Sequence, residues 1–355
     1  MKAQKIKIAL LFGGRSAEHE VSLISAASIY NNLDKKKYEI TSIYINKEGN
    51  WRIVDSPLLS PPDLKEGLFS SFIPWAKKST SKAIEADIYF PVLHGPYGED
   101  GTIQGLFEIA DVPYVGATVL ASAVGMDKAV AKTLHKARNL PVVKHIIVLE
   151  KDWIEQRESI LAKIRKEFHL PFFVKPANMG SSVGITKNKD FAQTESALQT
   201  AFQYDRKILV EQGIQGRELE CSVLGNDNPK ASLPGEIIPC REFYDYSDKY
   251  IEGKTSFGIP ADLASGITKE IQRLSIEAYK AIDCSGMARV DFFLEEKTGK
   301  IFMSEINTIP GFTEISMYPK LWEVSGTPYP QLLSKLIELG FERYKKKKRR
   351  IGVKP

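Results

Sequence analysis

The segment from residue 286 to residue 311 constrains the fold more than any other stretch of the chain. Its sequence, GMARVDFFLEEKTGKIFMSEINTIPG, has two apolar runs separated by a polar turn at residues 295–300. The turn contains Gly299, which can adopt a positive φ at no steric cost. Two apolar runs joined by such a turn predict a β-hairpin.

Each predicted strand of this hairpin has one apolar face and one polar face, because side chains alternate along a strand. If the two polar faces coincide, Asp291 and Glu305 lie close together with Asn307 beside them. Two carboxylates about 4 Å apart repel by roughly 4 kcal/mol at an effective dielectric of about 20, so a cation is expected between them. On the first strand, one face carries Arg289, Asp291 and Phe293, and the other carries Val290, Phe292 and Leu294. On the second strand, one face carries Met303, Glu305 and Asn307, and the other carries Phe302, Ser304 and Ile306.

The ligand chemistry of this polar face favours magnesium. Carboxylate and amide oxygens are hard ligands, and the segment contains no His or Cys, so Mg²⁺ fits better than zinc. The alternative is a solvated polar face on an edge hairpin, since a short D-x-F…E-x-N pattern also occurs without any function. The rest of the chain decides between these interpretations.

The length and composition of the chain predict a globular protein of two or three domains. It has 355 residues, of which 43% are hydrophobic and 26% charged. The net charge is +5, but the run Lys345–Arg350 alone carries six positive charges, so nothing outside this run indicates a nucleic-acid partner. We expect this basic run to be a solvated, disordered end, with weak binding to an anionic surface as the alternative.

Cysteine usage and hydrophobic runs predict a soluble, cytoplasmic protein. The three cysteines, Cys221, Cys240 and Cys284, are widely spaced and form no C-x-x-C motif, which is typical of reduced thiols. The apolar run at residues 6–12 is too short for a signal sequence, and no other run approaches the length of a membrane span. We therefore expect no insertion into membranes.

The first third of the chain opens with a predicted βα unit of a parallel sheet. A buried strand at residues 6–12 is followed by the tight turn Gly13-Gly14-Arg15 and a helix from Ser16 to about Asn31. Ser16 is the predicted N-cap of this helix. The glycine pair lacks the G-x-G-x-x-G spacing, so the sequence does not support a dinucleotide-binding fingerprint.

A second βα unit places a glycine-rich loop at the carboxyl end of a strand. The strand at residues 87–93 precedes the loop HGPYGEDG at 94–101 and a helix from about 102 to 110. His94 and Glu18 are predicted at the same edge of the sheet, where a histidine and a helix N-terminus can bind a small carboxylate. The alternatives are a hydrogen-bonded surface histidine and a glutamate stabilised by the helix dipole.

The middle third predicts a phosphate-binding loop between two strands. The strand 172–176 contains Lys175, and the loop ANMGSSVG at 177–184 follows it. Backbone N–H groups and hydroxyls of such a loop can bind a phosphate. The loop differs from a Walker A motif, because its lysine precedes the glycines and no helix follows directly. A flexible hairpin tip is the alternative interpretation.

Two glutamates at strand ends are candidate nucleotide ligands. Glu211 ends the apolar run 208–211, and Glu218 begins the alternating run 217–224. Both carboxylates are placed to accept hydrogen bonds from an adenine amino group and from ribose hydroxyls. They are equally consistent with strand ends that face solvent.

Taken in order along the chain, these motifs resemble the D-alanine–D-alanine ligase family of the ATP-grasp superfamily. The resemblance extends from about residue 6 to about residue 340, and eight ordered motifs are together far more specific than any one alone. The motifs are GGRSAEHEVS (13–22), LHGPYGEDGTIQG (93–105), MDK (126–128), VKP (174–176), GSSVG (180–184), FYDYSDKY (243–250), ARVDFF (288–293) and EINTIPGFTEIS (305–316).

The resemblance implies a fold of α/β and α+β parts. An N-terminal parallel-sheet α/β domain at residues 1–125 would hold the first D-alanine. A central ATP-grasp subdomain at 126–216 and a C-terminal one at 217–355 would enclose the nucleotide, the latter with the metal site and the basic tail. The family resemblance also implies a homodimer.

The resemblance assigns expected roles to individual residues. Met317 stands where many members have Leu, a conservative change that leaves the assignment intact. ATP would contact Lys128, Lys175, Gly180, Ser182, Glu211, Ile214 and Glu218. Two Mg²⁺ ions, replaceable by Mn²⁺, would be held by Asp291, Glu305 and Asn307. Substrate would contact His94, Lys249, Gly311, Ser316 and Met317, with Glu18, Ser181, Tyr250 and Arg289 as the catalytic group.

The implied reaction joins two D-alanines at the expense of ATP, for peptidoglycan precursor synthesis. One carboxylate is activated as an acyl phosphate, and Arg289 stabilises charge at the attacked carbonyl. Because acyl phosphates hydrolyse, a lid must exclude water, and the segment 243–255 is the candidate. A Tyr at position 250 accompanies family members that make the dipeptide, so D-alanine is the predicted second substrate. The alternatives are another ATP-grasp carboxylate–amine ligase and a nucleotide-binding regulatory protein without the chemistry.

Overall fold

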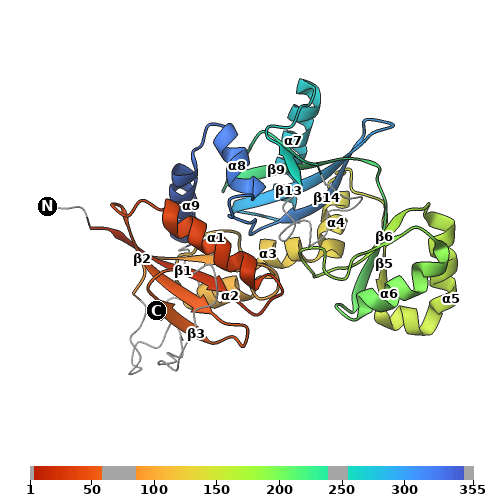
Figure 1. Cartoon of the computed structure of the whole chain (residues 1–355), viewed down its shortest axis with the longest axis horizontal. Helices are drawn as coiled ribbons and strands as arrows, with labels where there is room; N and C mark the ends of the chain where they lie inside the picture. Colours follow the sequence, from red (N-terminus) through yellow and green to blue (C-terminus); the bar gives the residue numbers. More distant parts are fainter. Residues whose placement is uncertain (1–3, 58–84, 239–254, 348–355) are drawn as a thin grey trace, which may run out of the picture.

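The computed structural model describes residues 4–57, 85–238 and 255–347. The first of its three sheets, at the left of Figure 1, has the strand order β3-β2-β1-β4. β1 pairs in parallel with β2 and β4, as the two predicted βα units require, whereas the edge strand β3 is antiparallel. The elements are β1 (Ile6–Gly13), α1 (His19–Asn32), β2 (Tyr38–Ile45), β3 (Trp51–Val54), β4 (Ile88–Val92) and α2 (Thr102–Ile109).

The second sheet is antiparallel and contains the predicted hairpin. Its order is β12-β11-β9-β13-β14, with β10 paired to β9, and it lies at the centre of Figure 1. Its elements are β9 (Gly216–Gly225), β10 (Lys230–Ala231), β11 (Gly235–Ile238), β12 (Ser256–Gly258), α7 (Ser265–Ala281), β13 (Gly286–Glu295), β14 (Ile301–Asn307) and α8 (Met317–Val324). Two helices, α3 (Val119–Met126) and α4 (Lys128–Ala137), connect the first sheet to the third.

The third sheet, at the right of Figure 1, is also antiparallel, with the order β5-β8-β6-β7. The strand predicted to carry Lys175 is β6, and the predicted loop at 177–184 connects β6 to β7. Its elements are β5 (His145–Leu149), α5 (Glu150–Glu167), β6 (Phe172–Pro176), β7 (Thr186–Asn188), the 3₁₀ turn η1 (Phe191–Gln193), α6 (Thr194–Phe202) and β8 (Lys207–Gln212).

The hairpin of β13 and β14 is confirmed, and its two carboxylates stand opposite each other. Asp291 pairs with Glu305, and Gly299 in the turn has a φ of +66°. A β-bulge follows Asp291, so that Phe292 pairs with Met303. The prediction that Met303 shares a face with Glu305 is therefore wrong: the extra residue in β14 turns Met303 into the core, where it is 1% exposed.

The start of α1 also differs from the prediction. The helix begins at His19, so Ser16 is not its N-cap. The Ser16 hydroxyl instead accepts a hydrogen bond from the Glu18 backbone N–H (3.1 Å) and donates one to the His94 carbonyl oxygen (2.7 Å). Ser16 therefore joins the two loops at the carboxyl edge of the first sheet, at the cost of starting the helix later.

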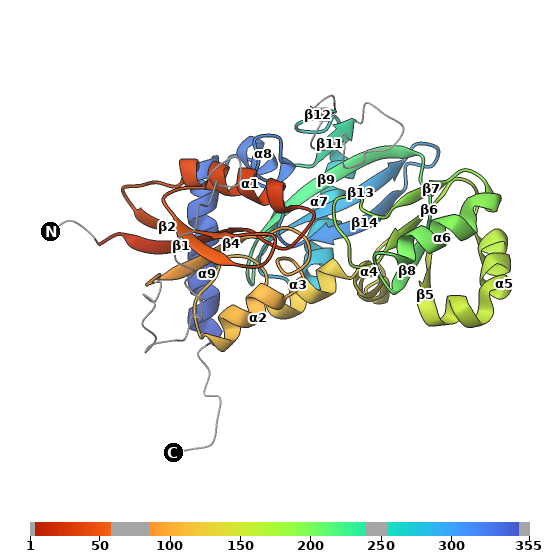
Figure 2. The same ribbon diagram turned by 60° about the horizontal axis from the view of Figure 1, so that its bottom comes forward.

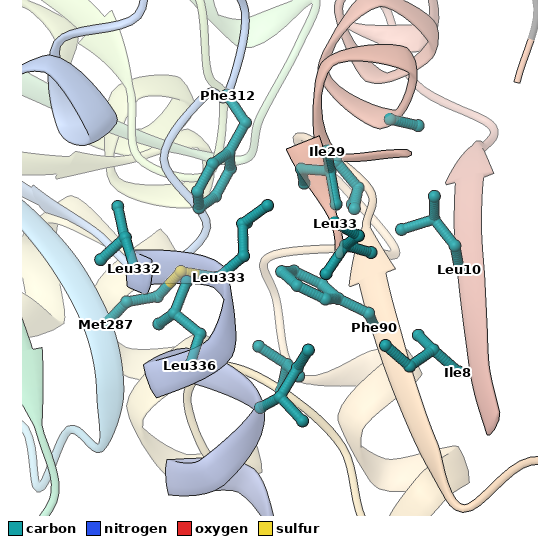
Figure 3. Close-up of a cluster of buried hydrophobic side chains, with 14 of the residues drawn as sticks. Ile8, Leu10, Ile29, Leu33, Phe90, Met287, Phe312, Leu332, Leu333 and Leu336 are labelled. Atoms are coloured by element: carbon teal, nitrogen blue, oxygen red, sulfur yellow. The ribbon is translucent and has the colours of Figure 1, made fainter. Parts of the chain in front are cut away.

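The last helix, α9 (Tyr329–Lys347), returns to pack against the first sheet. In Figure 2 it passes beside β1 and β4, although almost the whole chain separates them in sequence. The close-up in Figure 3 shows Leu333 and Leu336 of α9 between Phe90 of β4 and Met287 of β13, with Leu332 beside Met287. One hydrophobic core thus extends from the N-terminal sheet to the C-terminal helix. Within the part of the chain that the structure describes, no helix is long and apolar enough to cross a membrane.

Candidate active site

Two adjoining cavities lie between the three sheets. The first has a volume of about 120 Å³ and the second about 680 Å³, and their walls share Glu220, Ile237, Arg289 and Glu305. The predicted residues Glu18, His94, Lys128, Gly180, Ser181, Asn307, Gly311, Ser316 and Met317 line the first cavity. Lys175, Ser182, Glu211, Ile214, Glu218 and Asp291 line the second. Lys249 and Tyr250 lie outside the described residues, as does the predicted lid apart from Thr255.

Arg289 stands in the wall between the cavities and is held by two carboxylates. Its Nε and Nη2 atoms each donate to one oxygen of Asp291 at 2.7 Å, and Nε also lies 3.0 Å from Glu220 Oε2. Burial alone would lower the pKa of Arg289, but Asp291 and Glu220 raise it well above its usual value. The guanidinium is therefore a fixed positive charge facing both cavities.

The donor set on the hairpin fits a magnesium ion that is also bound by phosphates. In the described ranges of the chain, no three His, Cys, Asp or Glu side chains gather into a complete metal cage. Mg²⁺ usually binds one or two protein carboxylates and takes its other ligands from phosphates and water. Asp291 and Glu305, opposite each other on paired strands, match that pattern at the edge of the second cavity.

The second cavity has a buried ion-pair chain on its floor. The two carboxylate oxygens of Glu211 contact Lys175 Nζ at 2.6 Å and Lys132 Nζ at 2.9 Å. Burial would raise the pKa of Glu211, but the two lysines hold it below its usual value. Lys128, one turn before Lys132 on α4, donates to the Met179 carbonyl oxygen at 2.7 Å and lies 3.6 Å from Glu305. Lys175, Lys132 and Lys128 thus form a row of positive charges that extends from the third sheet to Glu305 of the hairpin.

The carboxylate of Glu18 lies between two glycines at the mouth of the first cavity. A Cβ atom at Gly95 or Gly180 would meet Glu18 Oε2 at 2.6 Å or 2.5 Å, so neither position tolerates a side chain without movement. The Ser181 hydroxyl donates to the other oxygen of Glu18. Ser181 and Ser182 have φ values of +47° and +61°, which residues other than glycine rarely adopt. The loop between β6 and β7 is therefore strained where it reaches the N-terminal part of the chain.

His94 is buried and contacts three different segments. Its Nδ1 lies 3.1 Å from the Ile309 carbonyl oxygen and 3.4 Å from Glu99 Oε1, and its Nε2 lies 3.2 Å from Ser25 Oγ. Burial would lower the pKa of His94, but Glu99 and Glu18 raise it. Burial raises the pKa of Glu99 to about 7, partly opposed by its hydrogen bond to His94. This region can therefore hold a proton near neutral pH.

Gly311 and Ser316 shape the opposite wall of the first cavity. A Cβ atom at Gly311 would lie 2.6 Å from Ser316 Oγ, so the glycine leaves room for that hydroxyl. Ser316 Oγ accepts a hydrogen bond from the Thr313 backbone N–H at 2.9 Å, directly before α8. Met317 is 4% exposed, and its side chain also contributes to the hydrophobic contacts of this wall.

Glu99, Lys132 and Glu220 are charged residues of the site that were not identified from the sequence. Sequence spacing gave a signal for two of them. Lys132 follows Lys128 by four residues, which places both on one face of α4, and Glu220 follows Glu218 by two residues on one face of β9. Glu99 lies in a loop, where no periodicity applies.

Comparison with known proteins agrees with this geometry. The families described as D-ala D-ala ligase N-terminus and C-terminus match residues 7–117 and 134–338. A D-alanine--D-alanine ligase of Solibacter usitatus is 51% identical over 97% of this chain and 98% of its own length. The solved D-alanine-D-alanine ligase of Coxiella burnetii is 41% identical, with a TM-score of 0.83 over 97% of this chain and 96% of its own.

The D-Ala:D-Ser ligase VanG of Enterococcus faecalis is also similar in structure. It is 34% identical, with a TM-score of 0.80 over 95% of this chain and 100% of its own. These structural neighbours confirm the predicted ATP-grasp fold. The matches cover nearly the full length of the chain and include both family segments. The chain therefore belongs to the D-alanine–D-alanine ligase family.

Proposed function

We propose that this protein is an ATP-dependent ligase that joins two D-alanines to D-alanyl-D-alanine, through a D-alanyl phosphate intermediate, for peptidoglycan precursor synthesis. The full-length similarity to relatives named D-alanine--D-alanine ligase carries the proposal. The two adjoining cavities support it, because the phosphoryl donor and the amino acid must bind next to each other, and cavities with shared lining residues allow this.

In the first proposed step, a D-alanine carboxylate in the first cavity attacks the γ-phosphorus of ATP in the second, which forms the D-alanyl phosphate and releases ADP. Glu18 binds the amino group of this D-alanine, and His94 lies near its carboxylate group. Lys128 and Lys175 neutralise the phosphates, and the loop containing Ser181 and Ser182 covers them. Bound Mg²⁺ at Asp291, Glu305 and Asn307 would supply further positive charge between these anions.

In the second step, the amino group of the second D-alanine attacks the acyl phosphate and releases phosphate. Arg289, which lines both cavities, stabilises the negative charge that develops on the oxygen of the reacting carbonyl. Gly311, Ser316 and Met317 surround the second amino acid, and Lys249 and Tyr250 belong to the proposed lid. Glu211, Ile214 and Glu218 hold the adenosine part of ATP.

We also propose the finer organisation expected from the family. The three units are residues 1–125, 126–216 and 217–355, and the protein is a cytoplasmic homodimer. The buried, free thiols of Cys221 and Cys284 are consistent with a reducing compartment. Size-exclusion chromatography with light scattering tests the dimer.

Phosphate release tests the proposed function. The purified protein is incubated with ATP and Mg²⁺, alone or with D-alanine, D-serine, D-lactate or L-alanine. The expected result is phosphate release that requires D-alanine and yields the dipeptide in equal amounts. Equal release with and without D-alanine would contradict the proposal. Preferred incorporation of D-lactate or D-serine would reassign the second substrate.

A further inference from the structure

Three carboxylates lie in a row across the hairpin and the strand beside it. Asp291 of β13 pairs with Glu220 of β9 on one side and with Glu305 of β14 on the other. Their side chains are increasingly exposed along this row, from 7% for Glu220 to 16% for Asp291 and 36% for Glu305. Glu220 is therefore the most deeply placed of the three and the least accessible to a ligand.

Arg289 contacts two members of the row at the same time. Both oxygens of Asp291 accept hydrogen bonds from its guanidinium, and Glu220 Oε2 lies 3.0 Å from Nε. The proposed metal role requires at least one Asp291 oxygen to turn towards a cation. Arg289 then loses part of its pairing while it remains buried, which is unfavourable unless another carboxylate retains it.

We propose that Glu220 is a positioning residue that keeps Arg289 in the wall between the two cavities when Asp291 binds a divalent cation. Without Glu220, the guanidinium depends more strongly on Asp291 and competes with the cation for its oxygens. Glu220 thereby allows one arginine and one metal ion to share Asp291. This inference rests on the metal role in the proposed function.

Manganese binding in the presence of ADP tests the inference without relying on turnover. Free Mn²⁺ is measured by electron paramagnetic resonance in titrations of the full-length protein. We expect Glu220→Gln to weaken Mn²⁺ binding about tenfold, the lower end for loss of a residue that orients a metal ligand. kcat is expected to fall more than KM for D-alanine rises, because a displaced Arg289 acts mainly on the transition state. Thermal unfolding of each variant confirms that the fold is retained.

Two control variants separate positioning from simple charge. Glu220→Asp keeps the negative charge but withdraws the carboxylate by about 1.5 Å, one carbon–carbon bond, so it should also bind Mn²⁺ more weakly than the wild type. Glu270→Gln removes a carboxylate that pairs with Arg273 on the exposed side of α7, and it should match the wild type.

The outcomes distinguish failure of this inference from failure of the proposed function. Wild-type affinity in Glu220→Gln, or full recovery in Glu220→Asp, would overturn the positioning role while leaving the ligase assignment intact. A wild-type protein that binds no Mn²⁺ with ADP would overturn both the metal role and the inference. D-alanine-dependent phosphate release, measured separately, then decides whether the protein is a ligase at all.

Discussion

The buried charges around the second cavity show how single residues hold an ion-pair chain together. Lys132 is 1% exposed, and it contacts both Glu211 and, at 2.6 Å, the carbonyl oxygen of Ser304. Burial lowers the pKa of Lys132 in spite of Glu211. One lysine thus connects the third sheet to the bulge of β14, directly beside Glu305.

Lys132→Met should destabilise the protein, because it removes one of the two lysines that pair with buried Glu211 among the described residues. We expect the free energy of unfolding to fall by about 3 kcal/mol, the lower end for a broken buried ion pair. Urea unfolding followed by circular dichroism measures this change. Lys151→Met is the matched control, since Lys151 is 79% exposed and its pair with Glu155 should contribute under about 0.5 kcal/mol. Equal effects of the two substitutions would refute a structural role for the buried pair.

The pH dependence of stability should report on the pair of Glu99 and His94. Burial raises the pKa of Glu99 to about 7 in the folded state, so the folded protein holds the Glu99 proton more tightly than the unfolded chain. The stabilising contribution of this proton is complete below about pH 4.5 and is lost as the pH rises through about 7.

Glu99→Gln removes the carboxyl group of this pair and should flatten the pH profile. Between pH 5 and pH 8 we expect the wild type to lose about 2 kcal/mol more stability than Glu99→Gln, as linkage predicts for such a shift. Urea unfolding at both pH values measures the difference. Glu323→Gln, at an exposed position on α8, should follow the wild-type curve. Parallel curves for the wild type and Glu99→Gln would show that this carboxyl does not hold the proton.

At the scale of elements, periodicity predicted the strands better than their local details. Alternation in ARVDFF placed Val290 and Phe292 in the core correctly, because a buried face requires apolar residues at every second position. The bulge beside Asp291 adds one unpaired residue, which leaves no mark in the hydrophobic pattern, so the face of Met303 was assigned wrongly. The contact of Arg289 with Glu220 joins two strands that are distant in the chain and follows only from sheet topology.

The packing of α9 predicts an unusual response to a glycine substitution. Gly340 lies within this helix, and a Cβ atom there would approach the Tyr114 carbonyl oxygen and Ile88 Cδ1 to 2.8 Å. Gly340→Ala should therefore destabilise the protein, although alanine normally stabilises a helix by about 1 kcal/mol relative to glycine. Gly105→Ala in α2 is the matched control, since a Cβ atom there would meet nothing within 4 Å, and it should stabilise. Thermal unfolding measures both, and stabilisation by Gly340→Ala would contradict the close packing.

At the scale of the whole molecule, the N-terminal sheet and the C-terminal helix depend on each other. Leu332, Leu333, Leu336 and Ile337 of α9 are at most 1% exposed, and they belong to the same core as one buried face of β1 and β4. Burial of one such side chain stabilises by about 1.5–3 kcal/mol. Four of them together are comparable with the total stability of a typical domain, about 5–15 kcal/mol.

A fragment of residues 1–125 should therefore not fold cooperatively by itself, even though it contains all four strands of the first sheet. We expect its urea transition to be broad, with a low m value, because the sheet face that α9 covers is exposed to water. Joining residues 327–347 to this fragment through a flexible linker should restore a sharp transition. The same fusion carrying Leu336→Ala and Leu333→Ala is the control, and it should not restore it. A sharp transition of the isolated fragment, with the midpoint of the fusion, would mean that the sheet is stable without α9.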